Sequence, residues 1–344
     1  MSGLGVALVG TGMWGGRLAA AVGRAPTVEL VTCYSRDDDR RAAFAAEHGC
    51  EAAQSFEAAL QHPRVEGVLL VTPNSAHAEQ AAACAEGGKH VFVEKPIADT
   101  LEDGRAIRDA CREAGVALLV GHCFRRLGAA RTVERLLAEG ALGEPVLAEA
   151  NFSLPGTLTP ASWRFYRETC PGGPLLQLGV HHADTLQHWL GRATRVAGSF
   201  ARLATGAEID DVGVALADLE SGARAVVGSS YVSPKTFSIR VLGTEGVVDY
   251  VTDMAVWPQA ERMDAATTVA LTTRDGRREI PFEPRDMLVE ELEEFARCAR
   301  GEAEPETGAD EALAALGLVL AAIESDAAGE AVVLEHEEVR RGSG

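Results

Sequence analysis

The first third of the chain alternates between short apolar runs and segments with helical periodicity. Continuous apolar runs, typical of strands buried on both faces of a parallel sheet, occur at 4–10, 28–35, 65–72, 90–94 and 116–121. Segments with apolar residues at helical spacing lie between them, at about 13–24, 38–48, 75–87 and 100–114. Because strand–helix alternation builds a parallel sheet covered on both faces, residues 1–122 are predicted to form an α/β, doubly wound Rossmann domain.

The pattern changes after residue 122. Helices are expected at about 125–139, within 171–191, at about 286–300 and at about 309–328. A strand is expected at 145–154, and from 194 to about 282 short strands follow one another with tight turns between them, which is typical of antiparallel hairpins. Residues 123–344 are therefore predicted to form an α+β domain with an open, mostly antiparallel sheet and helices on one face.

The helix within 171–191 carries an unusual polar stripe. At helical spacing, one of its sides bears Gln177, His181, Asp184 and His188. This stripe is compatible with a solvated surface, a metal site, or an acid–base group held against a substrate. His181 and His188 lie two turns apart, ~10 Å along the axis, whereas zinc ligands converge within ~2.0–2.2 Å of one ion. We therefore predict no metal at this stripe.

Composition narrows the classes of partner. The chain has 344 residues and a net charge of −19, with no block of lysine or arginine. Clustered positive charge gives affinity for phosphate backbones and anionic membranes, so neither nucleic acid nor a membrane is an expected partner. The seven cysteines are scattered without a CxxC spacing, and no apolar run approaches the ~18 residues of a membrane span. We expect a cytoplasmic protein with reduced thiols that binds a small molecule.

A glycine-rich loop follows the first apolar run and opens the first helix. It consists of Gly10, Thr11, Gly12, Met13, Trp14 and Gly15. In a GxGxxG loop the first glycine permits a tight turn, the second lets backbone approach a pyrophosphate, and the third allows the helix to pack closely on the strand. The following helix N-terminus supplies unpaired N–H groups. Since the motif lies between a predicted strand and a predicted helix, it predicts dinucleotide binding.

The end of the second strand bears on the choice of cofactor. An NAD-binding domain usually has an acidic residue at this position. This chain has Ser35 and Arg36 there instead. A serine and an arginine can bind the 2′-phosphate of NADP, so NADP is favoured over NAD. The alternative is that Arg36 is a surface arginine and that Asp37 binds the ribose.

Three further stretches join the glycine loop in a specific set. "VTPNSAH" (71–77) and "VEKPI" (93–97) follow apolar runs, and "GGPLLQLGVHHAD" (172–184) opens the helix with the polar stripe. With "GTGMWG", and over nearly the whole chain, the sequence resembles the Gfo/Idh/MocA family. The resemblance implies a two-domain NAD(P)-dependent oxidoreductase that acts on sugars, cyclic polyols or related carbonyl compounds.

The resemblance also implies roles for individual residues. Those that would line the cofactor groove are Thr72, Pro73, Asn74, His77, Glu94, Lys95, Pro96 and Arg164. Lys95 would project into the active site, the peptide bond before Pro96 would often be cis, and His181 would be the catalytic histidine. The sequence departs from the family pattern at Gln177, where relatives commonly carry an aspartate, and this departure leaves the substrate class open.

The chemistry of these residues is consistent with the same roles. Lys95 lies at the carboxyl end of a strand, where open α/β sheets bind their ligands. Histidine titrates in the range needed to take a hydroxyl proton, so we assign acid–base catalysis to His181, with Lys95 as its electrostatic partner. Candidate substrate contacts are Tyr166, Arg167, Gln177 and Asp184. Asp184 has a second interpretation, in which it orients His181.

Two other functions remain open from the sequence, and the fold also predicts an oligomer. Some relatives of this family cleave glycosidic bonds through transient oxidation by bound NAD, and others bind dinucleotide as regulators without turnover. An open sheet has an apolar face that needs cover, so a homodimer or homotetramer through the C-terminal sheet is expected.

Overall fold

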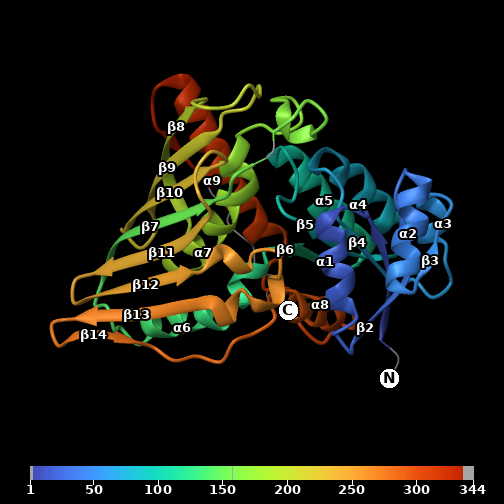
Figure 1. Ribbon diagram of the computed structural model, residues 1–344, viewed down its shortest axis with the longest axis horizontal. Helices are drawn as coiled ribbons and strands as arrows, with labels where there is room; N and C mark the ends of the chain where they lie inside the picture. The colour runs from blue at the N-terminus through green and yellow to red at the C-terminus, as the bar shows by residue number, and fades with distance from the viewer. Residues whose placement is uncertain (1–2, 157, 336–344) are drawn as a thin grey trace.

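The computed structural model describes residues 3–156 and 158–335, and they form two sheets with their covering helices (Figure 1). The first sheet has six parallel strands in the order β3-β2-β1-β4-β5-β6. Its strands are β1 (Leu4–Val9), β2 (Val28–Tyr34), β3 (Glu51–Ala52), β4 (Gly67–Leu70), β5 (His90–Glu94) and β6 (Leu118–Gly121). Its helices are α1 (Met13–Val22), α2 (Asp38–His48), α3 (Phe56–Leu60), α4 (His77–Glu86) and α5 (Leu101–Ala114).

This strand order creates a ligand-binding edge. The direction of winding reverses between β1 and β4, and ligands of such sheets bind beyond the carboxyl ends of the strands at this reversal. The loops after β1, β4 and β5 all open there. The predicted Rossmann fold is confirmed, although the sequence pattern missed the short elements β3 and α3 because neither is long enough to show a period.

The second sheet has nine strands in the order β14-β13-β12-β11-β7-β10-β9-β8-β15. They are β7 (Pro145–Ser153), β8 (Ala193–Ala201), β9 (Val212–Leu219), β10 (Arg224–Ser230), β11 (Thr236–Gly243), β12 (Gly246–Thr252), β13 (Thr267–Thr273), β14 (Gly276–Glu279) and β15 (Val332–Val333). All pairs are antiparallel except β7 with β10. The predicted mostly antiparallel sheet and its hairpins are therefore confirmed.

The helices of the C-terminal half are α6 (Gly128–Ala138), α7 (Val180–Leu190), α8 (Met287–Ala299) and α9 (Ala309–Ala328). Helices α6, α7 and α9 pack against the nine-stranded sheet, whereas α8 returns to the first sheet. There the ring of Phe295 meets Phe92 edge to face at 5.9 Å, and it lies so close to Gly67 that a Cβ on this glycine would be 3.0 Å away. Residues from the end of the chain thus help to build the N-terminal core, and the boundary at residue 122 stays a prediction.

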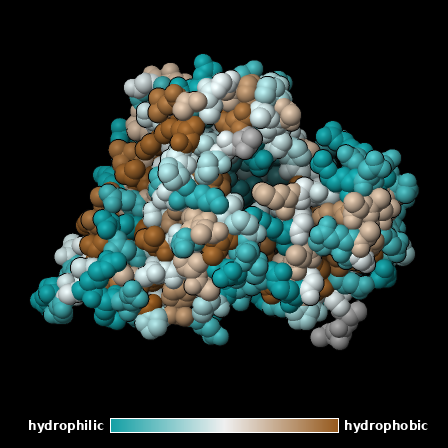
Figure 2. All heavy atoms as spheres, viewed as in Figure 1, coloured by the Kyte–Doolittle hydropathy of each residue, from teal (hydrophilic) through white to brown (hydrophobic). Residues whose placement is uncertain are grey.

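The opposite face of the nine-stranded sheet has no helix over it in the described part of the chain. Apolar side chains point outward from it, among them Val214 (37% exposed), Leu216 (48%) and Val251 (50%). Figure 2 shows hydrophobic atoms gathered on the side of the molecule that holds β8 to β10. An apolar face of this kind is unusual for a surface in contact with water. Within residues 3–156 and 158–335, no helix has both the length and the apolar composition to cross a bilayer.

Candidate active site

The glycine loop between β1 and α1 is shaped by close backbone contacts. Gly10 has a φ of +107°, and a Cβ on it would lie 2.3 Å from the carbonyl oxygen of Val71. A Cβ on Gly15 would lie 2.1 Å from the carbonyl oxygen of Gly10. At Gly12, in contrast, a Cβ would meet nothing within 4 Å. The first and third glycines are therefore required by packing, while the second faces open space where a ligand can approach the backbone.

The N-terminus of α1 has no side-chain partner of its own. The side chains of Asp37, Ser55 and Thr100 cap α2, α3 and α5, each with an acidic residue in the first turn. Gly12 precedes α1 without a side-chain cap, and its first turn has no acidic residue. Beside Gly12, the hydroxyl of Thr11 is buried and has no hydrogen-bond partner among residues 3–156 and 158–335. Free N–H groups and a positive helix end fit the pyrophosphate of a dinucleotide.

The residues after β2 place an exposed arginine beside a capping aspartate. Asp37 accepts a hydrogen bond from the backbone N–H of Arg40 at 2.9 Å as the cap of α2, which occupies one of its oxygens. The hydroxyl of Ser35 donates to the carbonyl of Asp37 at 3.2 Å. Arg36 is exposed and forms no ion pair with any carboxylate of residues 3–156 and 158–335. A free guanidinium at this position suits the 2′-phosphate of NADP.

A pocket of about 310 Å³ lies between the carboxyl ends of the first sheet and the inner face of the second. The sequence-predicted residues in its wall are Met13, Trp14, Thr72, Asn74, Glu94, Lys95, Arg164, Gln177 and His181. The other lining residues are Val71, Phe152, Leu154, Pro155, Gly156, Leu158, Ser162, Trp163, Leu178, Tyr231 and Trp257. The structure therefore brings Lys95 from the N-terminal half and His181 from the C-terminal half to one cavity.

Lys95 is held at the pocket by the chain opposite it. Its ammonium donates to the backbone carbonyl of Gln177 at 2.8 Å. This carbonyl belongs to a π-helical turn, Leu175–Gly179, that leads into α7, and such turns free carbonyls from the regular α-helical ladder. The peptide bond between Lys95 and Pro96 is cis, as the resemblance implies. The two halves of the chain thus meet through a direct hydrogen bond at the centre of the site.

His77 lies beneath the pocket and connects two of its loops. Its Nδ1 is 3.2 Å from the carbonyl oxygens of both Pro96 and Ile97, and its Nε2 is 3.0 Å from that of Thr72. The ring is fully buried. His77 therefore holds the loop after β4 against the loop after β5, and it does so from behind the pocket wall.

Burial shifts the titration of the ionisable groups in the pocket. It lowers the pKa of Lys95 to about 8, with a further contribution from Arg164, although Glu94 opposes the shift. Burial also raises the pKa of Glu94 to about 7, against the effect of Lys95 and of the Trp14 indole that donates to it. For His181, burial and then the charge of Lys95 hold the pKa well below its ordinary value. At neutral pH the site thus presents a neutral imidazole beside an ammonium ion.

The structure does not bring three of the predicted substrate contacts to the pocket. Asp184 is 1% exposed and accepts two hydrogen bonds from Arg125, each of 2.6 Å. The hydroxyl of Tyr166 donates to a backbone carbonyl at the surface, and Arg167 forms an ion pair of 2.9 Å with Asp210. The residues of the predicted polar stripe therefore have different surroundings. Gln177 and His181 line the pocket, whereas Asp184 pairs with Arg125 inside the protein.

An aromatic wall of the pocket escaped the sequence interpretation. Trp257, from the turns between β12 and β13, stacks on Trp14 with ring centroids 6.1 Å apart. The guanidinium of Arg17 lies over both rings, at 5.0 and 4.9 Å, and donates to the carbonyl of Trp257 at 2.8 Å. Since these residues are about 240 positions apart, no local pattern could have linked them.

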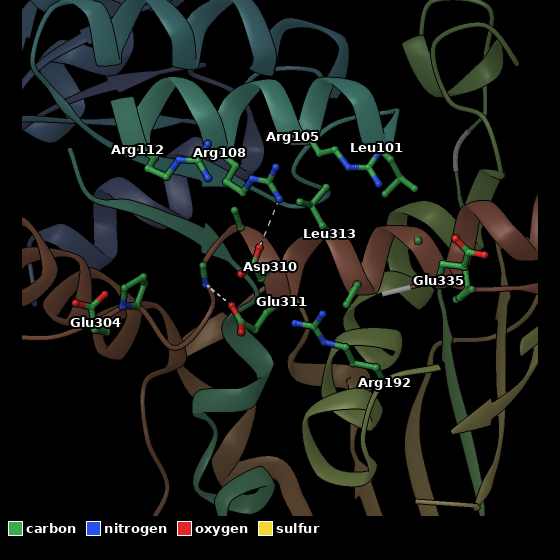
Figure 3. Close-up of a pocket in the computed structure, with 16 residues that line it drawn as sticks. Leu101, Arg105, Arg108, Arg112, Arg192, Glu304, Asp310, Glu311, Leu313 and Glu335 are labelled. Carbon is green, nitrogen blue, oxygen red and sulfur yellow. Dashed lines mark hydrogen bonds and ion pairs between the residues drawn. The ribbon is translucent and has the colours of Figure 1, made fainter. Parts of the chain in front are cut away.

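A larger cavity, of about 680 Å³, lies elsewhere, between α5 and α9 (Figure 3). Arginines of α5 face carboxylates there, and Arg108 lies 3.9 Å from Asp310. None of the predicted site residues lines this cavity. Its mixed charges and its separate set of lining residues distinguish it from the dinucleotide-binding edge.

A dinucleotide cradle that opens onto a pocket with a lysine and a histidine defines an NAD(P)-dependent oxidoreductase. Comparison with known families agrees: residues 4–122 match the oxidoreductase family with an NAD-binding Rossmann fold, and residues 130–249 match the GFO/IDH/MocA C-terminal domain. The chain belongs to the Gfo/Idh/MocA family of oxidoreductases.

Individual relatives cover nearly the whole chain. A 1,5-anhydro-D-fructose reductase of Ensifer adhaerens is 31% identical over 318 residues, which are 91% of this chain and 93% of that protein. A D-xylose 1-dehydrogenase (NADP+) of Haloferax volcanii is 29% identical and covers 89% of this chain and 92% of its own. A crystal structure provisionally assigned as an NADPH-dependent oxidoreductase of Desulfitobacterium hafniense DCB-2 is 36% identical, with a TM-score of 0.93 over 97% of this chain and 98% of its own. These relatives are a reductase, a dehydrogenase and an oxidoreductase, so the glycoside hydrolase alternative is not favoured.

Proposed function

We propose that this protein transfers hydride between NADP and a hydroxyl-bearing or carbonyl carbon of a sugar or related polyol. The observation that carries the proposal is the hydrogen bond of Lys95 to the chain of Gln177, which supports a single site that includes His181. When bound, the nicotinamide would supply the chemistry of hydride exchange. The dinucleotide would be held by the glycine loop and the uncapped N-terminus of α1.

His181 and Lys95 divide the proton chemistry between them. His181 is neutral at pH 7, so it can accept the proton that leaves the substrate hydroxyl. The ammonium of Lys95 stabilises the negative charge that develops on the same oxygen, which makes the hydroxyl easier to deprotonate. In the reverse direction the proton returns to the carbonyl oxygen from His181. The site thus serves oxidation or reduction with the same two groups.

The lining of the pocket supports a sugar-like substrate. The rings of Trp14, Phe152, Trp163, Tyr231 and Trp257 surround a small set of polar groups. Pockets for small ligands combine apolar walls with a few placed polar groups that fix orientation. Relatives that cover most of this chain are named for 1,5-anhydro-D-fructose and for D-xylose, which both have a polar rim of hydroxyls around an apolar ring.

The function is tested by following reduced cofactor by its absorbance. NADPH is offered with 1,5-anhydro-D-fructose, NADP+ with D-xylose and a panel of cyclic polyols, and NAD(H) is run in parallel. Sustained turnover with at least one of these compounds is the expected result. Cofactor binding with no turnover on the whole panel would contradict the proposal and favour a regulator that binds dinucleotide.

The preference for NADP depends on Arg36. Replacing Arg36 with Asp should lower kcat/KM for NADP by ~10- to 100-fold relative to NAD, because hydrogen bonds to charged groups contribute ~1.5–3 kcal/mol. The measurement is the ratio of kcat/KM for the two cofactors. Arg40→Gln, at an exposed arginine four residues along the chain, is the matched control and should leave the ratio unchanged. An unchanged ratio in Arg36→Asp would assign the ribose to Asp37.

The pH profile should show the unusual pKa of Lys95. Because the ammonium form is active, kcat/KM for alcohol oxidation should fall as pH rises through about 8, rather than near the ordinary 10.5. Glu94 raises the pKa of Lys95, so Glu94→Gln should move this alkaline limb to lower pH. An alkaline limb at the same pH in both proteins would show that the titrating group is not Lys95.

We also infer that two copies of the chain pair through the uncovered face of the nine-stranded sheet. Leu216 and Val226 lie opposite each other on β9 and β10, next to Val214, and form an apolar centre for such an interface. Leu216→Lys is expected to halve the mass measured by light scattering. Leu203→Lys, at a 71% exposed leucine outside the strands, is the control. A wild-type protein that is monomeric at micromolar concentration would overturn the inference.

A further inference from the structure

A second buried histidine lies next to the proposed base, His181. His122 follows β6 directly and is 1% exposed, and its ring meets that of His181 at 85° with centroids 6.1 Å apart. Both ring nitrogens of His122 and the Nδ1 of His181 are buried without a hydrogen-bond partner in the described structure. Buried polar atoms in folded proteins nearly always have a partner, so three unpartnered nitrogens at one place call for an explanation.

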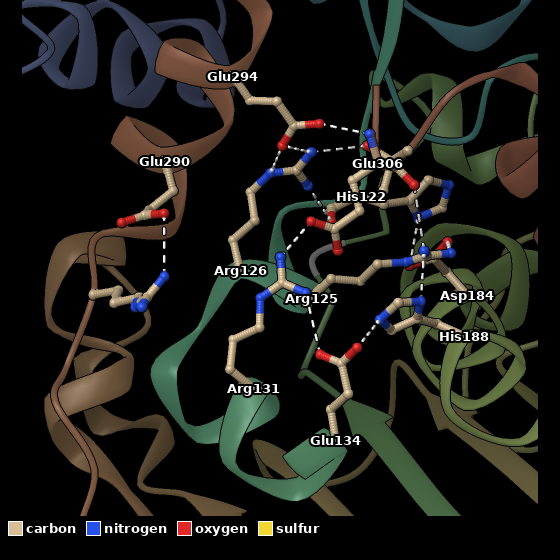
Figure 4. Close-up of polar contacts among 12 residues, drawn as sticks. His122, Arg125, Arg126, Arg131, Glu134, Asp184, His188, Glu290, Glu294 and Glu306 are labelled. Atoms are coloured by element: carbon tan, nitrogen blue, oxygen red, sulfur yellow. Dashed lines mark hydrogen bonds and ion pairs between the residues drawn. The ribbon is translucent and has the colours of Figure 1, made fainter. Parts of the chain in front are cut away.

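An anion also lies close to His122. The Oδ2 atom of Asp184 is 3.9 Å from the Nδ1 of His122, and both carboxylate oxygens accept hydrogen bonds from Arg125 (Figure 4). Burial opposes ionisation of Asp184, but the charge and the hydrogen bonds of Arg125 hold its pKa below the ordinary value, so this carboxylate stays ionised. His122 therefore has a permanent anion 3.9 Å from its Nδ1 and the ring of His181 in edge-to-face contact.

We propose that His122 is a positioning residue that holds His181 in the tautomer with its proton on Nδ1. The carboxylate of Asp184 favours a proton on the Nδ1 of His122, which leaves Nε2 of this ring as a hydrogen-bond acceptor. That acceptor stabilises a proton on the Nδ1 of His181, whose ring meets the His122 ring edge to face with centroids 6.1 Å apart. The Nε2 of His181 is then unprotonated and free to take the substrate proton. The proposal rests on the proposed function only for this last role.

The charges around His181 and His122 keep both rings neutral, so the position of the single proton on each ring is what their surroundings decide. Lys95 and His182 face His181, while Lys95, Arg125 and Arg126 face His122, and all of them disfavour a positive charge on the rings. Burial acts in the same direction, and Asp184 is the anion that opposes it at His122. Both imidazoles are therefore neutral at pH 7. A neutral imidazole has one proton, and its position decides whether Nε2 can act as a base.

The chain offers a matched control in His182. This residue is on the same helix as His181, is fully buried and has a pKa lowered to about 4, as is the pKa of His122. Its ring packs against Phe237 at 4.6 Å, and it is not among the groups that act on Asp184. A general effect of removing a buried histidine should therefore appear in both variants, whereas an effect on the tautomer should appear only at His122.

The test is nitrogen-15 NMR of the imidazoles in the cofactor-free protein, for wild type, His122→Phe, His122→Asn and His182→Phe. The wild type and His182→Phe should show His181 as the Nδ1–H tautomer, and His122→Phe should show a mixture. His122→Asn, which keeps a polar partner, should retain most of the wild-type signal. With NADPH and 1,5-anhydro-D-fructose, His122→Phe should lower kcat by ~10- to 100-fold, the range for partners that orient a functional histidine, with KM little changed.

Two results would overturn the proposal. One is a His181 tautomer that is the same in His122→Phe as in wild type, and the other is an equal change in His182→Phe. Thermal unfolding of each variant identifies one that fails to fold; if this is His122→Phe, the smaller apolar replacement His122→Leu takes its place with the same expected mixture of tautomers. If the wild type shows the expected tautomer but turns over none of the compounds, the proposed function fails while the assignment of His122 stands.

Discussion

Replacing Lys95 with Met is expected to lower kcat/KM by ~100- to 1,000-fold, because one donor to a developing oxyanion contributes about that much. His181→Ala should cost ~100- to 10,000-fold through the loss of acid–base transfer. The two residues act on the same oxygen, so the double variant should lose much less than the product of the single losses. Cofactor affinity should stay within a few-fold of wild type, because the dinucleotide is held by the glycine loop and α1.

These effects are measured as initial rates of cofactor absorbance, with cofactor affinity from the quenching of tryptophan fluorescence, since Trp14 and Trp257 line the pocket. Lys89→Met is a close control. Like Lys95, Lys89 donates to a backbone carbonyl, that of Val65 at 2.7 Å, but it lies outside the pocket. Turnover that survives in both Lys95→Met and His181→Ala would show that the reaction uses other groups.

The features of the site that are set by residues close together in the sequence could be predicted. Gly15 is required by a contact with Gly10 in its own turn, and Gly10 by its φ of +107°, so the spacing of these glycines predicts the loop. The strands of the first sheet are buried on both faces, which gives continuous apolar runs that are easily found. Lys95 follows one of these runs directly, and its place at the edge of the sheet follows from the fold class.

The polar stripe that leads into α7 shows what helical periodicity cannot predict. Helical spacing places Gln177, His181 and Asp184 on one side, but periodicity cannot tell which partners a buried side meets. The π-helical turn at 175–179 rotates Gln177 relative to the α-helix that follows, and Arg125 reaches Asp184 from a segment 59 residues earlier. A polar residue inside a protein needs a partner, and that partner came from tertiary structure.

The strand at the centre of the second sheet, β7, could not be placed from the sequence, because its partners lie far away in the chain. The hairpins could be predicted because their turns are local, as between β9 and β10 or between β11 and β12. Strand β7 lies between β10 and β11, parallel to the first and antiparallel to the second, although about 70 residues separate it from β10 in the chain. Nothing in the sequence of β7 itself specifies that position. For the same reason Trp257 and His122 were found only through the folded structure.

Removing the carboxylate of Asp184 should be the most destabilising of the substitutions considered. Asp184 and Arg125 are 1% and 4% exposed, and truncation of one partner of a buried ion pair leaves the other charge without compensation, which costs ~3–5 kcal/mol. We expect Asp184→Ala to lower the free energy of unfolding by about that amount, measured by urea denaturation. KM for the sugar should change little, because Asp184 does not line the pocket.

Replacing Arg125 together with Asp184 tests whether the loss of stability comes from the unpaired charge or from lost packing. In Arg125→Met with Asp184→Leu, both charges are replaced by apolar side chains, and such replacements are often neutral or stabilising. The double variant should therefore recover most of the stability that Asp184→Ala loses, yet both variants should have a lower kcat than wild type, since His122 lacks its anion in each. A variant Asp184→Ala with wild-type stability and a raised KM would instead return Asp184 to the role of a substrate contact. The ion pair predicts the opposite, because two hydrogen bonds of 2.6 Å already occupy both oxygens of this carboxylate.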